Sequence, residues 1–170
     1  MSSLRNLRPV APILVAAALM LTLVMGIRQC LGLFMQPAVK ELSLAVADFT
    51  LAIAIQNIAW GILQPFAGAW AGRYGFRPVM LSGAVAFVLG LALLALATSM
   101  AGVVIGAGLL IGYSLSCCGA GLAMAVASRP VPATIRSTVL GMVSAAGSLG
   151  TLMAAPIGQT LSQDFGWRTG

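Results

Sequence analysis

The chain has 170 residues, of which 60% are hydrophobic and only 7% are charged, and its net charge is +6. Because a soluble domain carries roughly 25% charged residues, this composition excludes a water-soluble globular protein and makes lipid the expected surroundings. The basic residues lie between apolar runs and form no basic stripe with interleaved aromatic residues, so we expect no nucleic-acid partner.

Five apolar stretches are long enough to cross a membrane, since a spanning helix needs about 20 residues. They cover residues 10–39, 49–71, 79–98, 100–127 and 138–161. The segments between them are short and carry turn residues such as Gly, Pro and Ser. The sequence therefore predicts an all-α membrane protein with a five-helix transmembrane bundle over residues 10–161.

Basic residues gather on one predicted side of the membrane, where no acidic residue accompanies them: Arg5, Arg8, Arg73, Arg77, Arg129 and Arg136. The opposite side carries both signs: Lys40, Arg168, Glu41, Asp48 and Asp164. The positive-inside rule then predicts a cytoplasmic N-terminus over residues 1–9 and an extracytoplasmic end over residues 162–170. We expect a multi-pass protein of the cell membrane, namely of a bacterial inner membrane.

Arg28 is a charged residue inside a predicted span. It lies about 18 residues into the first span, roughly 27 Å along the helix, and no acidic residue falls within any of the five spans. A central arginine costs about 2.5 to 3.5 kcal/mol on insertion scales, a cost normally tolerated only beside a cavity or a partner. Because a guanidinium matches a carboxylate in two hydrogen bonds, Arg28 is predicted to bind a substrate anion. A partner acid outside this sequence and snorkelling toward the headgroups remain alternatives.

Further polar candidates follow in the second and fourth spans. Gln56 and Trp60 are four residues apart and share a helical face, with Asn57 on the adjoining face. Amides are costly in hydrocarbon unless they are bonded, so these residues are predicted to line a polar cavity, with helix-to-helix bonding as the alternative. Tyr113 is a candidate substrate donor, or else a packing residue.

The sequence gives no sign of a metal, cofactor or catalytic site. Cys30, Cys117 and Cys118 lie inside apolar runs, and the chain has no His. A zinc or redox site is therefore not expected. Ser and Cys lack a nearby base, so no enzymatic machinery is visible and we expect no enzyme.

The stretch from Gly68 to Pro78 reads GAWAGRYGFRP and lies between the second and third predicted spans. We expect a short loop in which Gly72 and Gly75 provide tight turns. It resembles the loop between helices two and three of the major facilitator superfamily of secondary transporters, and Gly68, Arg73, Gly75 and Arg77 match that motif. Gly72 stands where the family usually has Asp. The resemblance implies a role of this loop in gating, by setting the preference for inward-open or outward-open states.

Three further segments are similar to the branch that contains oxalate/formate antiporters and monocarboxylate transporters: residues 26–37, residues 135–150, and the GWR of Gly166–Arg168. The resemblance implies an incomplete six-helix N-terminal half that ends before a sixth helix. It also implies a missing C-terminal half or a second chain as partner.

The function that the resemblance implies is secondary active transport of a small organic anion, a monocarboxylate or a dicarboxylate, by alternating access. In this interpretation Arg28 attracts the anion. Gln56, Asn57, Trp60 and Tyr113 shape the pocket. Two alternatives stay open: half of a drug or metabolite exporter in which Arg28 is structural, and a non-transporting membrane module that pairs with a partner.

Overall fold

The computed structural model describes residues 11–166, and within this range the chain is helical and contains no strand. Five helical stretches are long and apolar enough to cross a membrane. Four of them are single helices, and the fourth along the chain is built from shorter segments. The all-α membrane fold expected from the sequence is confirmed.

The single helices begin and end close to the apolar stretches, but they overrun or shift from the predicted bounds by up to five residues. They are α1 (Ala11–Leu42), α2 (Val46–Tyr74), α3 (Phe76–Ala95) and α7 (Ala133–Phe165). The fourth span consists of α4 (Met100–Val103), the π-helix η2 (Val104–Leu110), α5 (Ile111–Cys118) and α6 (Ala120–Ser128). Hydropathy thus locates each span, whereas the local turn geometry sets its ends.

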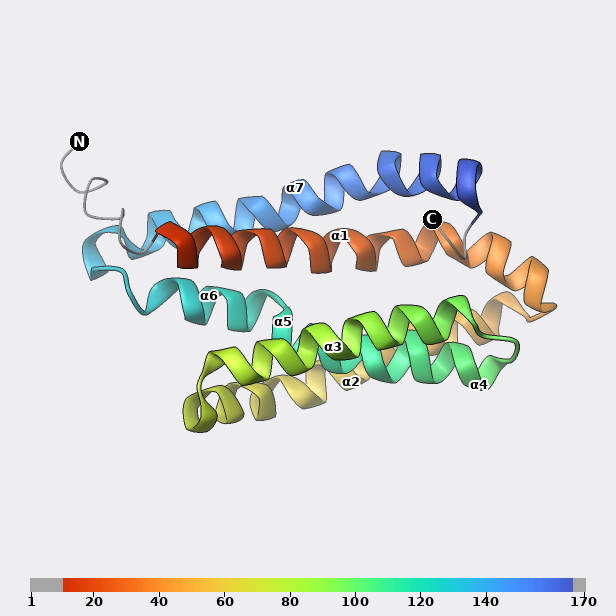
Figure 1. Cartoon of the computed structure of the whole chain (residues 1–170), viewed down its shortest axis with the longest axis horizontal. Coiled ribbons are helices and arrows are strands. Elements are labelled where there is room, and N and C mark those ends of the chain that lie inside the picture. Colours follow the sequence, from red (N-terminus) through yellow and green to blue (C-terminus); the bar gives the residue numbers. More distant parts are fainter. Residues whose placement is uncertain (1–10, 167–170) are drawn as a thin grey trace.

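The helices form two layers joined by the fourth span (Figure 1). In one layer α1 and α7 lie side by side along most of their length. In the other layer, η2 and α5 pack against α2 and α3, while α6 leaves them to pack against α1 and α7. The fourth span therefore contacts both layers.

Small residues bring α1 and α7 together. A Cβ atom added at Gly26 would lie 3.0 Å from the carbonyl oxygen of Gly150, and one added at Gly150 would collide with the backbone of Thr22. The hydroxyl of Thr22 donates a hydrogen bond to the carbonyl oxygen of Ala146 at 2.8 Å. Close backbone approach and interhelical hydrogen bonds hold helices together in lipid. The contact between α1 and α7 therefore depends on Gly26 and Gly150 having no side chain.

The second layer is packed in the same way around the fourth span. A Cβ atom at Gly106 would lie 2.9 Å from the carbonyl oxygen of Gly90, and one at Gly112 would lie 2.9 Å from that of Gln56. Glycines therefore let the fourth span run at backbone distance from both α2 and α3.

The fourth span departs from the regular helix expected over residues 100–127. Seven residues, Val104–Leu110, form a π-helix, and Gly119 takes an extended conformation (φ −76°, ψ −174°) between α5 and α6. The Gly119 N–H still donates to the carbonyl oxygen of Leu115, at 2.8 Å. A Cβ atom at this position would collide with that same oxygen, which explains why the break falls on a glycine.

The connection between α2 and α3 is shorter than the predicted loop. α2 continues through Arg73 to Tyr74 and α3 begins at Phe76, so Gly75 alone connects them. Gly75 has a φ of 88°, which a residue with a side chain rarely adopts. The expectation that Gly72 also forms a turn is wrong, because Gly72 lies inside α2, where i→i−4 backbone bonds continue through it.

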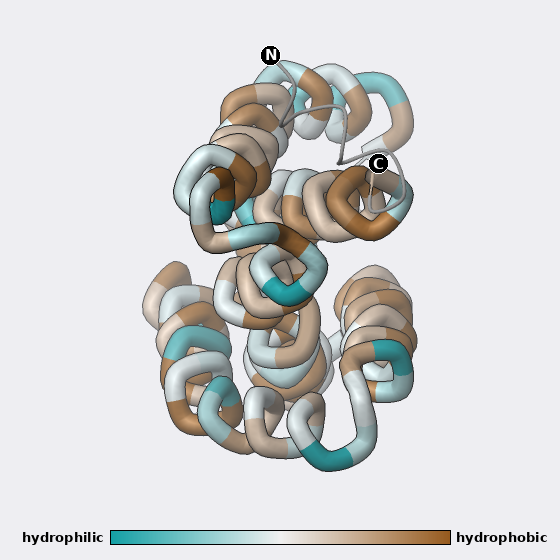
Figure 2. Tube along the Cα trace, turned by 90° about the vertical axis from the view of Figure 1, so that its left-hand side faces the viewer, coloured by the Kyte–Doolittle hydropathy of each residue, from teal (hydrophilic) through white to brown (hydrophobic). Residues whose placement is uncertain are grey.

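Large apolar side chains cover the outer faces of the bundle. Leu81 on α3 is 66% exposed and Leu152 on α7 is 71% exposed. In the view onto one end of the bundle, strongly hydrophilic residues lie at the turns and helix ends facing the viewer, and the helices behind them are mostly hydrophobic (Figure 2). A surface of this kind is stable against acyl chains and unstable in water.

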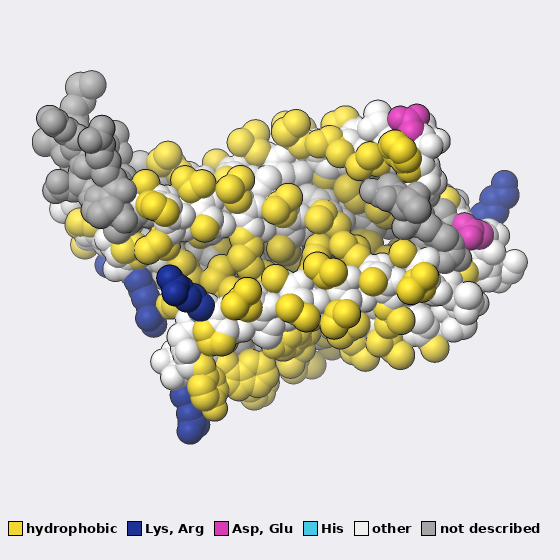
Figure 3. Space-filling view, in the orientation of Figure 1, with side chains coloured by type: hydrophobic (Ala, Val, Ile, Leu, Met, Phe, Trp, Pro, Cys, Tyr) yellow, Lys and Arg dark blue, Asp and Glu magenta, His cyan; other side chains and the backbone are white. Residues whose placement is uncertain are grey.

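Apart from Arg28, the charged side chains of the described residues lie near the two ends of the bundle (Figure 3). One end carries Arg73, Arg77, Arg129 and Arg136, and the other carries Lys40, Glu41, Asp48 and Asp164. Arg5, Arg8, Trp167 and Arg168 lie outside the described residues. That the arginine-rich end faces the cytoplasm stays a prediction of the positive-inside rule.

Candidate functional site

Arg28 lies near the middle of α1, about 26 Å from the first residue of that helix at 1.5 Å per residue. Its half-buried side chain reaches across to α2. There its Nη2 donates a 2.7 Å hydrogen bond to Oδ1 of Asn57, and its Cζ lies 5.3 Å from the ring centroid of Trp60. Three of the predicted site residues therefore meet at mid-height between α1 and α2.

The geometry of α2 presents Asn57 and Trp60 to Arg28 together, because residues three apart share one helical face. The Asn57 amide nitrogen donates to the carbonyl oxygen of Ile53, one turn earlier, at 2.8 Å. That bond directs the nitrogen back along α2 and leaves Oδ1 free to accept from the guanidinium. The indole ring offers its negative face to the same cation.

Two donors at this site have no acceptor. Nε of Arg28 and Nε1 of Trp60 are buried and lack a hydrogen-bond partner in residues 11–166. The acid nearest to Arg28 along α1 is Glu41, 13 residues and about 20 Å away. The site thus combines a positive charge with uncharged neighbours and spare N–H groups.

The fourth span packs against Trp60. Ser116 on α5 donates its hydroxyl to the carbonyl oxygen of Trp60 at 3.1 Å. A Cβ atom at Gly119 would lie 3.6 Å from Nε1 of the indole, so the break between α5 and α6 lies against the ring. Sequence reasoning did not single out Gly119, because the same span holds several other glycines and nothing in the sequence sets this one apart.

Gln56 does not join this group, although it was predicted to line the same cavity. It is 1% exposed, and its Nε2 donates to the carbonyl oxygen of Ala107 in η2 at 2.7 Å. Adjacent helical residues point about 100° apart, so Gln56 faces the fourth span while Asn57 faces α1. The alternative of helix-to-helix bonding describes its position.

Tyr113 also lies elsewhere. Its hydroxyl is 2.8 Å from Oγ of Ser82, which places it at the contact between α5 and α3. Ser82 also donates to the carbonyl oxygen of Val79 at 2.8 Å. The described structure does not bring Tyr113 to Arg28, and Ser82 is a partner that the sequence analysis missed.

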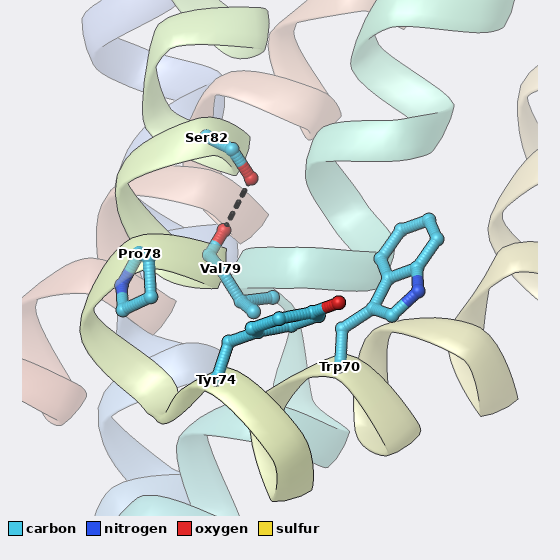
Figure 4. Close-up of a pocket in the computed structure, with 5 residues that line it drawn as sticks. All are labelled: Trp70, Tyr74, Pro78, Val79 and Ser82. Carbon is cyan, nitrogen blue, oxygen red and sulfur yellow. Dashed lines mark hydrogen bonds between the residues drawn. The ribbon is translucent and has the colours of Figure 1, made fainter.

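The predicted gating segment forms the hairpin of α2 and α3. Gly68 and Arg73 belong to α2, Gly75 connects the helices, and Arg77 belongs to α3. A shallow, mostly apolar pocket of about 200 Å³ opens beside this hairpin (Figure 4), lined by Trp70, Tyr74, Pro78, Val79 and Ser82. The gating role of the α2–α3 hairpin stays a prediction.

Arg77 lines a second hollow, of about 450 Å³, between α1 and α3, together with Met20, Met80, Leu81 and Ala84. At the same end of the bundle Arg129 places its Cζ 4.4 Å from the ring centroid of Phe76. Arg73 is likewise 5.6 Å from the ring centroid of Tyr74. Aromatic faces thus serve as partners for arginines of this end, where the chain offers no acid.

The described residues hold no cluster of three or more His, Cys, Asp or Glu side chains that could bind a metal ion. Cys30, Cys117 and Cys118 are buried and free. Cys30 donates to the carbonyl oxygen of Ala154 and Cys118 to that of Met80, each at 3.3 Å. They contribute to helix packing.

Comparison with known proteins assigns the family. The family model of the Major Facilitator Superfamily matches residues 17–170, which is most of the chain. The chain belongs to the major facilitator superfamily. Its five helices, each long and apolar enough to cross a membrane, agree with this assignment.

Curated relatives place the chain within this superfamily. It is 30% identical over 154 residues to monocarboxylate transporter 11 of Mus musculus, and the match covers 84% of the chain and 32% of that protein. The corresponding protein of Homo sapiens is 29% identical over 154 residues, with 84% and 30% covered. The chain thus spans about a third of the length of these relatives. No solved structure matches it.

Proposed function

We propose that this chain is part of a secondary active transporter that moves a small organic anion, of the monocarboxylate or dicarboxylate class, across the cell membrane by alternating access. Membership of the superfamily and the likeness to proteins named monocarboxylate transporter support the proposal. In this scheme Arg28 binds the anion, and the N-terminus of the chain lies in the cytoplasm.

The observation that carries the proposal is the environment of Arg28. A guanidinium at mid-height of a spanning helix is costly unless its charge is balanced. Here its contacts are an amide and an aromatic ring, and one of its N–H groups lacks an acceptor among residues 11–166. A carboxylate would supply both the missing acceptor and the missing negative charge.

Alternating access requires a second bundle beside this one. Around such a site, transporters expose the substrate to each side by rocking one bundle against another. Because the relatives extend over about three times the matched length, we place the opposite wall of the pathway in a second bundle. That bundle would come from the same polypeptide or from a partner chain.

The test replaces Arg28. In a Trp70→Phe, Trp167→Phe background Trp60 is the sole indole, and its emission reports ligands at Arg28, 5.3 Å away. We titrate the purified protein in lipid nanodiscs with formate, acetate, oxalate and succinate. We expect Arg28→Gln to weaken binding of the preferred anion at least about 30-fold, because losing one partner of a buried charge pair costs about 2–5 kcal/mol. Arg28→Lys keeps the charge but loses the planar fork, so its affinity is expected to lie between the two.

The matched control is Lys40→Gln, which removes one positive charge from the last turn of the same helix. We expect it to leave the titration unchanged, since Lys40 lies about 18 Å from Arg28 along α1. If Arg28→Gln and Arg28→Lys bind every anion as the parent does, the proposed role of Arg28 is wrong.

A further inference from the structure

The hydrogen bond between Arg28 and Asn57 uses only one of the two N–H donors along one edge of the guanidinium. In a guanidinium, Nε–H and one Nη2–H point along the same edge and together bind a carboxylate in two parallel bonds. Here Nη2 is bonded to Asn57 at 2.7 Å, while Nε is buried and has no partner in the described part of the chain. The edge is therefore half satisfied.

Asn57 cannot complete that edge. Its amide has a single oxygen, and its nitrogen donates to the carbonyl oxygen of Ile53. A carboxylate has two oxygens at the spacing of the fork and carries a full negative charge. At the same edge it would form two charge-assisted bonds in place of one bond to a neutral amide.

This exchange would also change how the layers are joined. Arg28 belongs to α1, which packs mainly against α7, and Asn57 belongs to α2 of the other layer. While Oδ1 of Asn57 holds Nη2, the guanidinium ties the two layers together at mid-height. An anion that takes over Nη2 breaks that hydrogen bond and leaves the contact with the Trp60 ring in place.

We propose that Asn57 is an internal substitute for the substrate: its side-chain oxygen holds Arg28 when the site is empty, and a bound carboxylate displaces it and thereby loosens the link between α1 and α2. This inference rests on the proposed function, because it takes Arg28 as the anion-binding residue. It assigns Asn57 the role of a competitor, whereas a residue that simply lines the pocket would add to the affinity.

The two roles predict opposite signs for one substitution. A competitor that occupies the site lowers the apparent affinity by the fraction of time that it is bound, so Asn57→Ala is expected to lower the Kd of the preferred anion by about tenfold. Asn57→Leu, which keeps the bulk and removes the acceptor, should act in the same direction. Asn57→Asp places a fixed carboxylate beside the guanidinium and should raise the Kd by at least about 100-fold.

The measurement is the Trp60 emission titration with the same four carboxylates. The matched control is Thr50→Ala: Thr50 lies two turns earlier on α2, and its hydroxyl donates to the carbonyl oxygen of Val46 within the same helix, as the Asn57 amide does to Ile53. Thr50→Ala therefore removes a comparable local bond without touching Arg28, and its Kd should equal that of the parent. Gel filtration and circular dichroism select the folded variants for comparison.

The outcomes separate the two proposals. Tighter binding by Asn57→Ala or Asn57→Leu, with binding lost in Arg28→Gln, supports the inference. Weaker or unchanged binding by both Asn57 variants, again with binding lost in Arg28→Gln, overturns the inference and leaves Arg28 as the anion site. Equal binding by Arg28→Gln and the parent, or no response in any protein, overturns the proposed function itself.

Discussion

Arg28 shows how a charge is held among apolar helices by partners that carry no charge of their own. The face of Trp60 contributes about 0.5–2 kcal/mol by attracting the cation, the larger value applying when water is excluded. The hydrogen bond that Arg28 donates to Oδ1 of Asn57 adds a neutral acceptor at 2.7 Å. These contacts offset part of the cost of placing the arginine there and leave the remainder available to a bound anion.

At the same scale, Gly150 sets how closely α1 and α7 approach. We expect Gly150→Ala to lower the free energy of unfolding by about 1–3 kcal/mol, because the added methyl group would collide with the backbone of Thr22 and force the helices apart. The measurement is a denaturant titration in detergent micelles followed by circular dichroism.

Gly141→Ala is the control for this prediction. It makes the same substitution on the same helix, at a position where a Cβ atom meets nothing within 4 Å. A gain in helix propensity should make it neutral or slightly stabilising. Equal losses in the two variants would show that helix separation is not the cause.

The sequence singled out Arg28 and Asn57, because charge and amide groups in an apolar run must be satisfied by something nearby, and the structure brings both together with Trp60. That these residues bind a substrate stays a prediction. The sequence did not predict which groups these side chains would bond to. Gln56 and Asn57 are adjacent and chemically alike, yet one bonds to η2 and the other to Arg28. That choice depends on which helix lies on each side of α2, and the composition of α2 carries no such information.

At the scale of elements, the fourth span differs most from a regular helix. A π-helix near its start and an extended glycine about two thirds of the way along it change its direction, and its packing partners change from α2 and α3 to α1 and α7. π-helical turns and breaks of this kind are frequent at functional sites. Here the break lies against Trp60.

Gln56 supports this irregular segment. We expect Gln56→Leu to lower the free energy of unfolding by about 1 kcal/mol, because the carbonyl oxygen of Ala107 loses a 2.7 Å hydrogen bond in a buried setting. The same detergent titration measures it. Gln159→Leu, on an exposed position of α7, should show no loss. A loss of equal size there would assign the effect to glutamine replacement in general.

Apolar runs of about 20 residues predict spanning helices reliably, since every backbone group in lipid must be bonded within its own helix. They do not predict the π-helix over Val104–Leu110 or the single-residue connection at Gly75. The π-helix lies where Gly106 and Gly108 bring the fourth span against α3 and α2, which is a property of the packed bundle. A turn at Gly75 was expected from the sequence, but its length of one residue was not.

At the scale of the whole molecule, arginines at one end and acidic residues at the other give the bundle a direction. We expect the variant Tyr74→Cys to react with a membrane-impermeant maleimide only after cells are permeabilised. The variant Ala47→Cys is expected to react in intact cells. Both positions are exposed and lie at opposite ends of α2.

The parent protein is the control, because its three cysteines are buried and should not react. The reverse labelling pattern would invert the proposed orientation. Labelling of both positions in intact cells would contradict the span assigned to α2.

The single residue between α2 and α3 has a mechanical consequence. Two peptide units separate the Cα atoms of Tyr74 and Phe76 by at most about 7.6 Å, so these helices cannot part at the arginine-rich end. If α2 and α3 separate, they must rotate about Gly75 as a hinge, and the distance between them must increase toward the opposite end of the bundle. A small change in the angle between α2 and α3 at Gly75 would then produce a large displacement of the helix ends at the other membrane face.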